Sequence, residues 1–82
     1  MTASKILWTR SERMIGRTKP IPSGESIYES SDGLFIIRQR RFGSRVDYLL
    51  DVGGHPAPRG LREHDTLAEA KQAAQDIAED SL

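Results

Sequence analysis

Three turn signals that contain glycine constrain the middle of this chain more than any other feature of its sequence. Asp32-Gly33 is typical of a type I′ hairpin turn, in which both central residues have positive φ. Gly43-Ser44 is typical of a type II′ turn, in which glycine comes first, and Gly53-Gly54 marks the end of a strand. The segments between these signals are rich in aliphatic and aromatic residues and predict three antiparallel strands: 27–30, 34–41 and 46–52.

Because two-residue turns fix the strand register, each side chain can be assigned to a face of the predicted sheet. The turn at Gly43-Ser44 places Arg40 opposite Asp47, and the remaining pairs follow from it. One face then carries the predicted core: Tyr28, Phe35, Ile37, Val46, Tyr48, Leu50 and Val52. The opposite face, which we call the outer face, carries a mixture of aliphatic and charged side chains: Ile27, Glu29, Leu34, Ile36, Arg38, Arg40, Asp47, Leu49 and Asp51.

A helix is predicted at the end of the chain. Thr66-Leu67-Ala68-Glu69 is a capping box, and the helical pattern continues to about Asp80. Its apolar stripe consists mostly of small residues that let a helix lie close to a sheet: Leu67, Ala70, Ala73, Ala74, Ile77 and Ala78. Residues 53–65 are predicted to be a loop. The predicted fold class is therefore α+β, a three-stranded antiparallel β-meander packed against one C-terminal α-helix.

The first part of the chain is less clear. Residues 1–19 show no decisive periodicity, and Pro20-Ile21-Pro22-Ser23-Gly24 is expected to interrupt regular structure. We therefore divide the chain into an N-terminal segment, 1–19, and a single β-β-β-α domain, 20–82. A lid over the sheet, a helix and an extra strand are the alternatives for the N-terminal segment.

Length and composition narrow the classes of function. A chain of 82 residues forms one domain with a thin core. The 12 Lys and Arg balance the 12 Asp and Glu, which argues against a polyelectrolyte binder that works through net charge. The charge is uneven, since residues 5–45 hold nine basic and four acidic side chains, net +5, while residues 46–82 hold three and eight, net −5.

We expect no catalysis and no cofactor. The chain has no cysteine, which excludes disulfides and thiolate metal sites. His55 and His64 share a loop with acidic residues, but their spacing matches no metal-site pattern. The small predicted core leaves little room for a small-molecule substrate. No apolar run reaches the length of a membrane span and no signal peptide is visible, so we expect a cytoplasmic location and no membrane partner.

Arginines surround the predicted turn at Gly43-Ser44. They could grip phosphates while an aromatic ring stacks on a base, which makes this hairpin a candidate DNA-binding element: Arg38, Arg40, Arg41, Phe42 and Arg45. The alternative is that the arginines only pair with carboxylates on the same sheet face: Glu29, Asp47 and Asp51.

The aliphatic residues of the outer face also need an explanation, because one helix cannot cover both faces of a sheet. These residues are Ile27, Leu34, Ile36 and Leu49. One explanation is that the N-terminal segment folds back as a lid through Ile6, Leu7, Trp8 and Ile15. The other is that the four residues, with Trp8, form a surface for a partner or for a second copy, since exposed apolar patches mark interfaces.

The strand pattern followed by Asp65-Thr66-Leu67-Ala68-Glu69-Ala70-Lys71-Gln72-Ala73-Ala74 resembles that of small β-β-β-α modules. One is the arm-type, AP2-like N-terminal domain of tyrosine integrases, whose sheet reads DNA; this resemblance implies that Arg38, Arg40 and Arg45 contact DNA. Another is the double-stranded RNA-binding domain, which has a cluster of lysines at the start of its last helix. The corresponding positions of this chain are 65–69, which contain no lysine. In size and composition the chain also resembles short orphan proteins of phages and prophages in high-GC bacteria, many of which bind host proteins.

The sequence thus predicts a small non-enzymatic protein that acts through protein–protein contact, with an unidentified partner or with itself as a homodimer. A phage-type accessory or host-modulating role fits this prediction. The alternative is a DNA-binding module that uses the arginine-rich hairpin 38–45.

Overall fold

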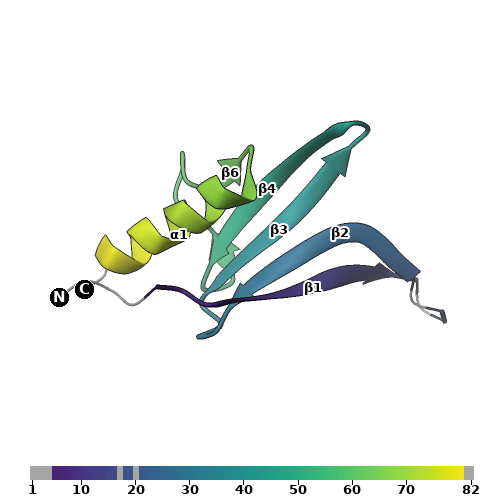
Figure 1. Ribbon diagram of the computed structural model, residues 1–82, viewed down its shortest axis with the longest axis horizontal. Coiled ribbons are helices and arrows are strands. Elements are labelled where there is room, and N and C mark those ends of the chain that lie inside the picture. Colours follow the sequence, from purple (N-terminus) through teal and green to yellow (C-terminus); the bar gives the residue numbers. More distant parts are fainter. Residues whose placement is uncertain (1–4, 17, 20, 81–82) are drawn as a thin grey trace.

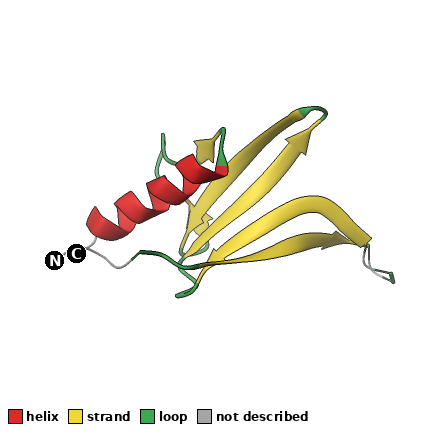
Figure 2. Cartoon of the chain, in the orientation of Figure 1, coloured by secondary structure: helices red, strands yellow, loops and turns green. Residues whose placement is uncertain are grey.

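The strands form one antiparallel sheet with a helix on one of its faces, in a computed structural model that describes residues 5–16, 18–19 and 21–80 (Figures 1 and 2). The elements are β1 Trp8–Ile15, β2 Ile21–Ser30, β3 Phe35–Phe42, β4 Arg45–Val52, β5 His55–Pro56, β6 Glu63–His64 and α1 Leu67–Asp80. Residues 1–4, 17, 20, 81 and 82, which belong to the predicted segments 1–19 and 20–82, lie outside the described residues. The predicted α+β class with a C-terminal helix is confirmed. The sheet has more strands than the three that were predicted.

The strand order is β1-β2-β3-β4-β5, and β6 pairs with β4 as well. The short strands β5 and β6 both lie along the edge of β4 that faces away from β3. Gly53 and Gly54 have φ of 61° and 82°, as a type I′ turn requires, and they send the chain back from β4 into β5. The prediction of a continuous loop over 53–65 is therefore wrong at His55–Pro56 and Glu63–His64.

The predicted hairpin between β3 and β4 is confirmed in its register. Arg40 lies opposite Asp47, and Phe42 lies opposite Arg45. Gly43 has φ of 62° and Ser44 has no positive φ, as expected for a type II′ turn with glycine first.

The turn between β2 and β3 is not of type I′, because only Gly33, and not Asp32, has a positive φ. Instead, Oδ1 of Asp32 accepts hydrogen bonds from Oγ of Ser30 at 2.6 Å and from the backbone N–H of Leu34 at 3.0 Å. The four-residue loop 31–34 is centred on the same point as the predicted two-residue turn. The strand register, with Tyr28 opposite Ile37, and hence the assignment of faces, is the same for both turns.

Of the three alternatives for the N-terminal segment, the extra strand is the one observed. β1 pairs with β2 from Trp8 to Ile15 with one interruption, where Arg13 alone faces residues 23–25 of β2. Gly24 has φ of 80°, and its N–H donates to Oε1 of Glu12 at 3.0 Å, which stabilises this bulge. The prediction that residues 21–24 interrupt regular structure is wrong; Pro20 is not described. Proline is tolerated at position 22 because β2 pairs there with β1 alone.

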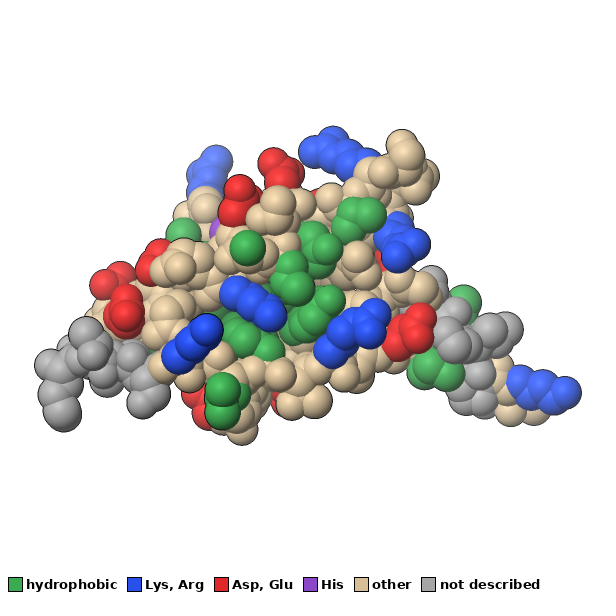
Figure 3. All heavy atoms as spheres, in the orientation of Figure 1, with side chains coloured by type: hydrophobic (Ala, Val, Ile, Leu, Met, Phe, Trp, Pro, Cys, Tyr) green, Lys and Arg blue, Asp and Glu red, His purple; other side chains and the backbone are tan. Residues whose placement is uncertain are grey.

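The core lies between the sheet and α1. Phe35, Ile37 and Leu50 are fully buried, together with Ala70 and Ala74 of the helix, as predicted. The N–H of Glu69 donates to Oγ1 of Thr66, which confirms the predicted helix N-cap. The helix packs over β3, β4 and β6 rather than over β1 and β2. Figure 3 shows hydrophobic side chains gathered beside the helix, with Lys and Arg side chains among and around them.

Candidate functional site

The outer face of the sheet, opposite α1, is the candidate site. Leu49 is its most buried residue, with only 6% of its surface exposed. Its direct cross-strand neighbours are Arg38 on β3 and Glu63 on β6, whose long side chains flank it. Ile27 and Ile36 are half-buried on the same face, and Leu34 is 44% exposed at the β2–β3 turn. An apolar centre therefore lies within a ring of charged side chains.

The arginines of this face are held by carboxylates. Arg40 binds Asp47 through two hydrogen bonds, from Nε to Oδ1 at 2.9 Å and from Nη2 to Oδ2 at 2.6 Å. Nη2 of Arg40 also lies 3.8 Å from Oε1 of Glu63. Nη2 of Arg38 donates to Oδ2 of Asp51 at 2.6 Å. Arg38 and Arg40, two of the predicted DNA contacts, are thus each paired with a carboxylate of the same face.

The pair formed by Arg40 and Asp47 also shifts the titration of both groups. The hydrogen bonds from Arg40 lower the pKa of Asp47 below its ordinary value of 3.8, and burial opposes this shift only in part. The same contact raises the pKa of Arg40 above its ordinary value. The guanidinium carbon of Arg40 lies 5.0 Å from the centre of the Phe42 ring, so a cation–π contact holds it from a second side.

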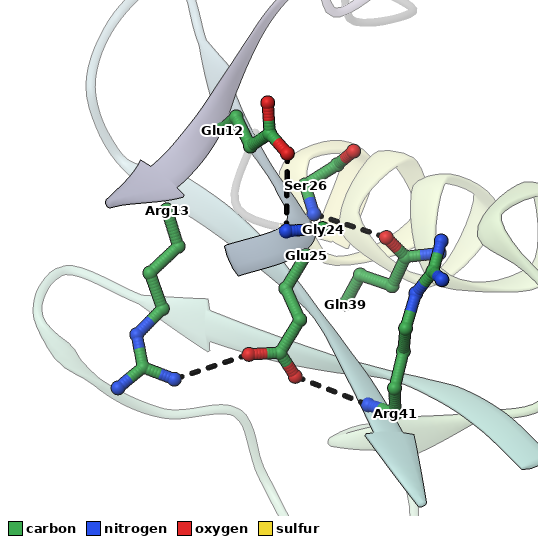
Figure 4. A network of polar contacts seen from close by, with 7 residues as sticks. All are labelled: Glu12, Arg13, Gly24, Glu25, Ser26, Gln39 and Arg41. Carbon is green, nitrogen blue, oxygen red and sulfur yellow. Dashed lines mark hydrogen bonds and ion pairs between the residues drawn. The ribbon is translucent and has the colours of Figure 1, made fainter. Parts of the chain in front are cut away.

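The two hairpins of the sheet, β1–β2 and β3–β4, diverge at one end (Figure 1). The outer face is hollow there, between Ile27 of β2 and Arg38 of β3. The backbone pairing between β2 and β3 ends at Ile27 and Arg38. Beyond that point side chains bridge the gap (Figure 4): the N–H of Ser26 donates to Oε1 of Gln39 at 3.0 Å, and the N–H of Arg41 donates to Oε2 of Glu25 at 3.1 Å. The two hairpins are therefore still connected by hydrogen bonds where their backbones have separated.

This hollow, which we call the fork hollow, has a volume of about 290 Å³. It is lined by Arg13, Glu25, Ile27, Arg38, Gln39, Arg40 and Leu49. Its apolar lining comes from Ile27 and Leu49, and Nη1 of Arg13 donates to Oε1 of Glu25 at 3.1 Å on its rim. A hollow of this size and openness accommodates one side chain of a partner rather than a drug-sized ligand.

The structure does not bring the predicted basic cluster together. Arg41 lies opposite Val46 and so on the helix side of the sheet, whereas Arg45 lies opposite Phe42 and so on the outer face. Both arginines are exposed, and neither forms an ion pair with a carboxylate of the described residues. The hairpin tip offers two separated guanidinium groups beside Phe42, which is 55% exposed.

The prediction that Trp8 belongs to the apolar surface of the outer face is wrong. Trp8 lies opposite Ser30 and packs against the core on the helix side. Ile6 lies near α1 as well, because its N–H donates to Oε1 of Gln75 at 3.0 Å. The prediction of an N-terminal lid over the outer face is therefore wrong. The reason is that β1 extends the sheet sideways, so its residues cannot cross over a sheet face.

Three residues of the fork hollow were missed from the sequence. Arg13 and Glu25 come together only because of the bulge opposite Arg13, and the sequence gives no pattern for that bulge beyond Gly24. Gln39 is a neutral residue in a run of arginines, and nothing in the sequence marks it as part of the site. The side chain of His64 contacts the backbone: its Nε2 lies 2.6 Å from the carbonyl oxygen of Leu61.

Two further properties of the described residues limit what the site can be. No three of their His, Asp and Glu side chains are grouped closely enough to hold a metal ion. Within the same part of the chain, the one helix is too short and too polar to cross a membrane.

Comparisons of the whole chain with protein-family models, with curated proteins and with solved structures found no match.

Proposed function

We propose that this chain is a small non-enzymatic binding protein whose outer face binds an apolar side chain of a protein partner. The observation that carries the proposal is the fork hollow, in which Ile27 and Leu49 form an apolar lining between two hairpins. Apolar surface framed by polar side chains is typical of protein interfaces.

The electrostatics of the hollow favour a protein over a nucleic acid. Each arginine that lines it has a carboxylate partner: Arg13 with Glu25, Arg38 with Asp51, and Arg40 with Asp47. A polyanion would have to displace these carboxylates or lie beside them. A partner with a neutral, apolar side chain needs neither, and the paired arginines can still donate hydrogen bonds from the rim to carbonyl groups of its backbone.

The hydrogen bonds between the two hairpins support the same proposal. The bridges from Ser26 to Gln39 and from Arg41 to Glu25 connect the hairpins beside the hollow before any partner binds. A preformed surface loses little conformational entropy on binding, so a small contact can still give measurable affinity.

Selection from a library of random peptides displayed on phage tests the proposal. We expect enriched peptides to share an apolar residue and to bind Ile27→Ser about tenfold more weakly than the wild type, because the substitution removes apolar surface from the hollow. Leu61→Ser is the matched control, since Leu61 is 37% exposed and lies outside the fork hollow. Circular dichroism checks that both variants keep their fold. Peptides that bind all three proteins equally would place the binding surface elsewhere.

Duplex DNA is the second candidate partner, and the exposed Arg41 and Arg45 beside Phe42 favour it. Fluorescence anisotropy with a labelled duplex distinguishes the candidates. Binding to DNA would weaken steeply with salt, because each phosphate contact releases counterions, and Arg41→Glu with Arg45→Glu would abolish it. No binding at low salt would leave the protein partner as the better proposal.

A further inference from the structure

The free edge of β1 carries a second surface. β1 is the first strand in the sheet order, so its second edge has no strand neighbour among the described residues, and Figure 1 shows it along the margin of the sheet. An edge of eight residues with free N–H and C=O groups is a template for another strand. We infer that this edge pairs antiparallel with β1 of a second copy of the chain, an inference that goes beyond the proposed function.

The direction of the free backbone groups follows from one hydrogen bond. The N–H of Ser31 donates to the carbonyl oxygen of Leu7 at 2.9 Å, so Leu7 and Ser31 form a hydrogen-bonded pair of the β1–β2 ladder. Hydrogen-bonded and non-hydrogen-bonded pairs alternate in an antiparallel ladder. The N–H and C=O groups of Trp8, Arg10 and Glu12 therefore point away from β2, toward the free edge.

These outward groups leave few registers open to two antiparallel copies of β1. Outward groups must face outward groups, so even-numbered residues must lie opposite even-numbered residues. If the two-fold axis passes through Ser11, Arg10 of each copy lies opposite Glu12 of the other. Moving the axis to residue 10 or to residue 12 brings Arg10 opposite Arg10 or Glu12 opposite Glu12. Like charges directly opposite each other destabilise a sheet, and of these three registers only the axis at Ser11 pairs Arg10 with Glu12.

The same register brings exposed hydrophobic side chains together. It places Leu7, which is 69% exposed, opposite Ile15, which is 46% exposed. It also places Trp8 opposite Met14, which is 50% exposed. Three of the large hydrophobic residues exposed in the single chain would thus gain apolar neighbours on joining a second copy. The bulge does not prevent this pairing, because its extra residues lie in β2 and not in β1.

Charge reversal on the edge tests the inference. We expect analytical ultracentrifugation to show a reversible dimer of twice 9.2 kDa for the wild type. Arg10→Glu places Glu opposite Glu12, and Glu12→Arg places Arg opposite Arg10. Each single variant should therefore dimerise at least about tenfold more weakly than the wild type. An equimolar mixture of the two variants should dimerise again, because in the heterodimer every such pair has opposite charges.

The controls separate this surface from others. Arg45→Glu reverses an exposed charge away from β1 and should dimerise like the wild type. In the wild-type dimer, mixed isotope labelling should show a contact between the Hα atoms of the two copies of Ser11, which form a non-hydrogen-bonded pair at the axis. A wild-type chain that stays monomeric up to millimolar concentration overturns the inference. Single variants that dimerise as tightly as the wild type also overturn it, since they place the interface elsewhere.

Discussion

The backbone N–H of Arg41 donates to Oε2 of Glu25 at 3.1 Å, at a point where β2 and β3 no longer pair through their backbones. Glu25 also accepts a hydrogen bond from Nη1 of Arg13 through its other oxygen. One carboxylate therefore connects β1, β2 and β3 at the open end of the fork hollow (Figure 4). This side chain lines the candidate site and connects its strands beyond the last backbone pair of β2 and β3.

Glu25→Ala should loosen the fork without unfolding the protein. We expect loss of the bridge to Arg41 to lower the free energy of unfolding by about 1 kcal/mol, the usual contribution of one hydrogen bond, and loss of the ion pair with Arg13 to add to this. Native-state hydrogen exchange should show the Arg41 amide exchanging about fivefold faster, which corresponds to the same free energy. Glu25→Gln is the matched control, because its amide oxygen can still accept from Arg41. Equal exchange rates in all three proteins would show that the bridge does not hold the hairpins.

The pair formed by Arg40 and Asp47 predicts a dependence of stability on pH. Because the folded-state pKa of Asp47 lies below 3.8, its ionised form stabilises the fold above that pH, and this contribution is lost as the pH falls through the lowered pKa. In Arg40→Gln the pKa of Asp47 should rise, and stability should depend less on pH below 3.8. The ¹³C shift of the Asp47 carboxyl group, followed against pH by NMR, measures the change.

Arg41→Gln serves as the control for this titration, since the guanidinium of Arg41 forms no ion pair with a carboxylate in the described part of the chain. We expect the pKa of Asp47 to stay at its wild-type value in that variant. An equal rise in both variants would mean that the general positive charge of the hairpin, and not the contact with Arg40, lowers the pKa.

The hairpin 35–52 and the helix could be predicted because their signals are local. The turn glycine at 43 fixes the register, and the alanine stripe with its cap at Thr66 fixes the helix face. The turn at Asp32 is not of the predicted type, but the predicted register of β2 and β3 is still correct. A two-residue and a four-residue loop with the same centre give the same register. Local sequence patterns determine faces reliably wherever one face is buried.

The sheet edges and the fork could not be predicted because they depend on contacts between distant residues. β1 is exposed at seven of its eight positions, so it has no alternating pattern of burial. The sequence 20–24 contains two prolines and a glycine, yet residues 21–24 can belong to a strand because β3 has already separated from β2 there. The meeting of Glu25 with Arg13 and Arg41 follows from that separation and leaves no signal in the sequence.

A pair of substitutions in α1 tests the packing of the helix on the sheet. Ala74 is fully buried, whereas Ala68 is exposed on the same helix. Ala74→Glu places a charge and extra volume in the closest contact, and we expect a loss of more than about 3 kcal/mol or failure to fold. Ala68→Glu should change the free energy of unfolding by less than about 0.5 kcal/mol. Urea denaturation measures both, and similar losses would show that the helix face is assigned wrongly.

Gly54 offers a test of the turn between β4 and β5, which was not predicted to be a hairpin. Its φ is 82°, and a Cβ atom added there would meet no other atom within 4 Å. A substitution at this position is therefore strained only through its backbone conformation and not through contacts of the new side chain. We expect Gly54→Ala to lower the free energy of unfolding by about 1 kcal/mol, the cost of a left-handed conformation for an L-residue. Gly54→Asn should lose less, because asparagine adopts this conformation more readily. Urea denaturation compares the two variants with the wild type, and a larger loss for asparagine than for alanine would show that steric contact, and not backbone conformation, limits this position.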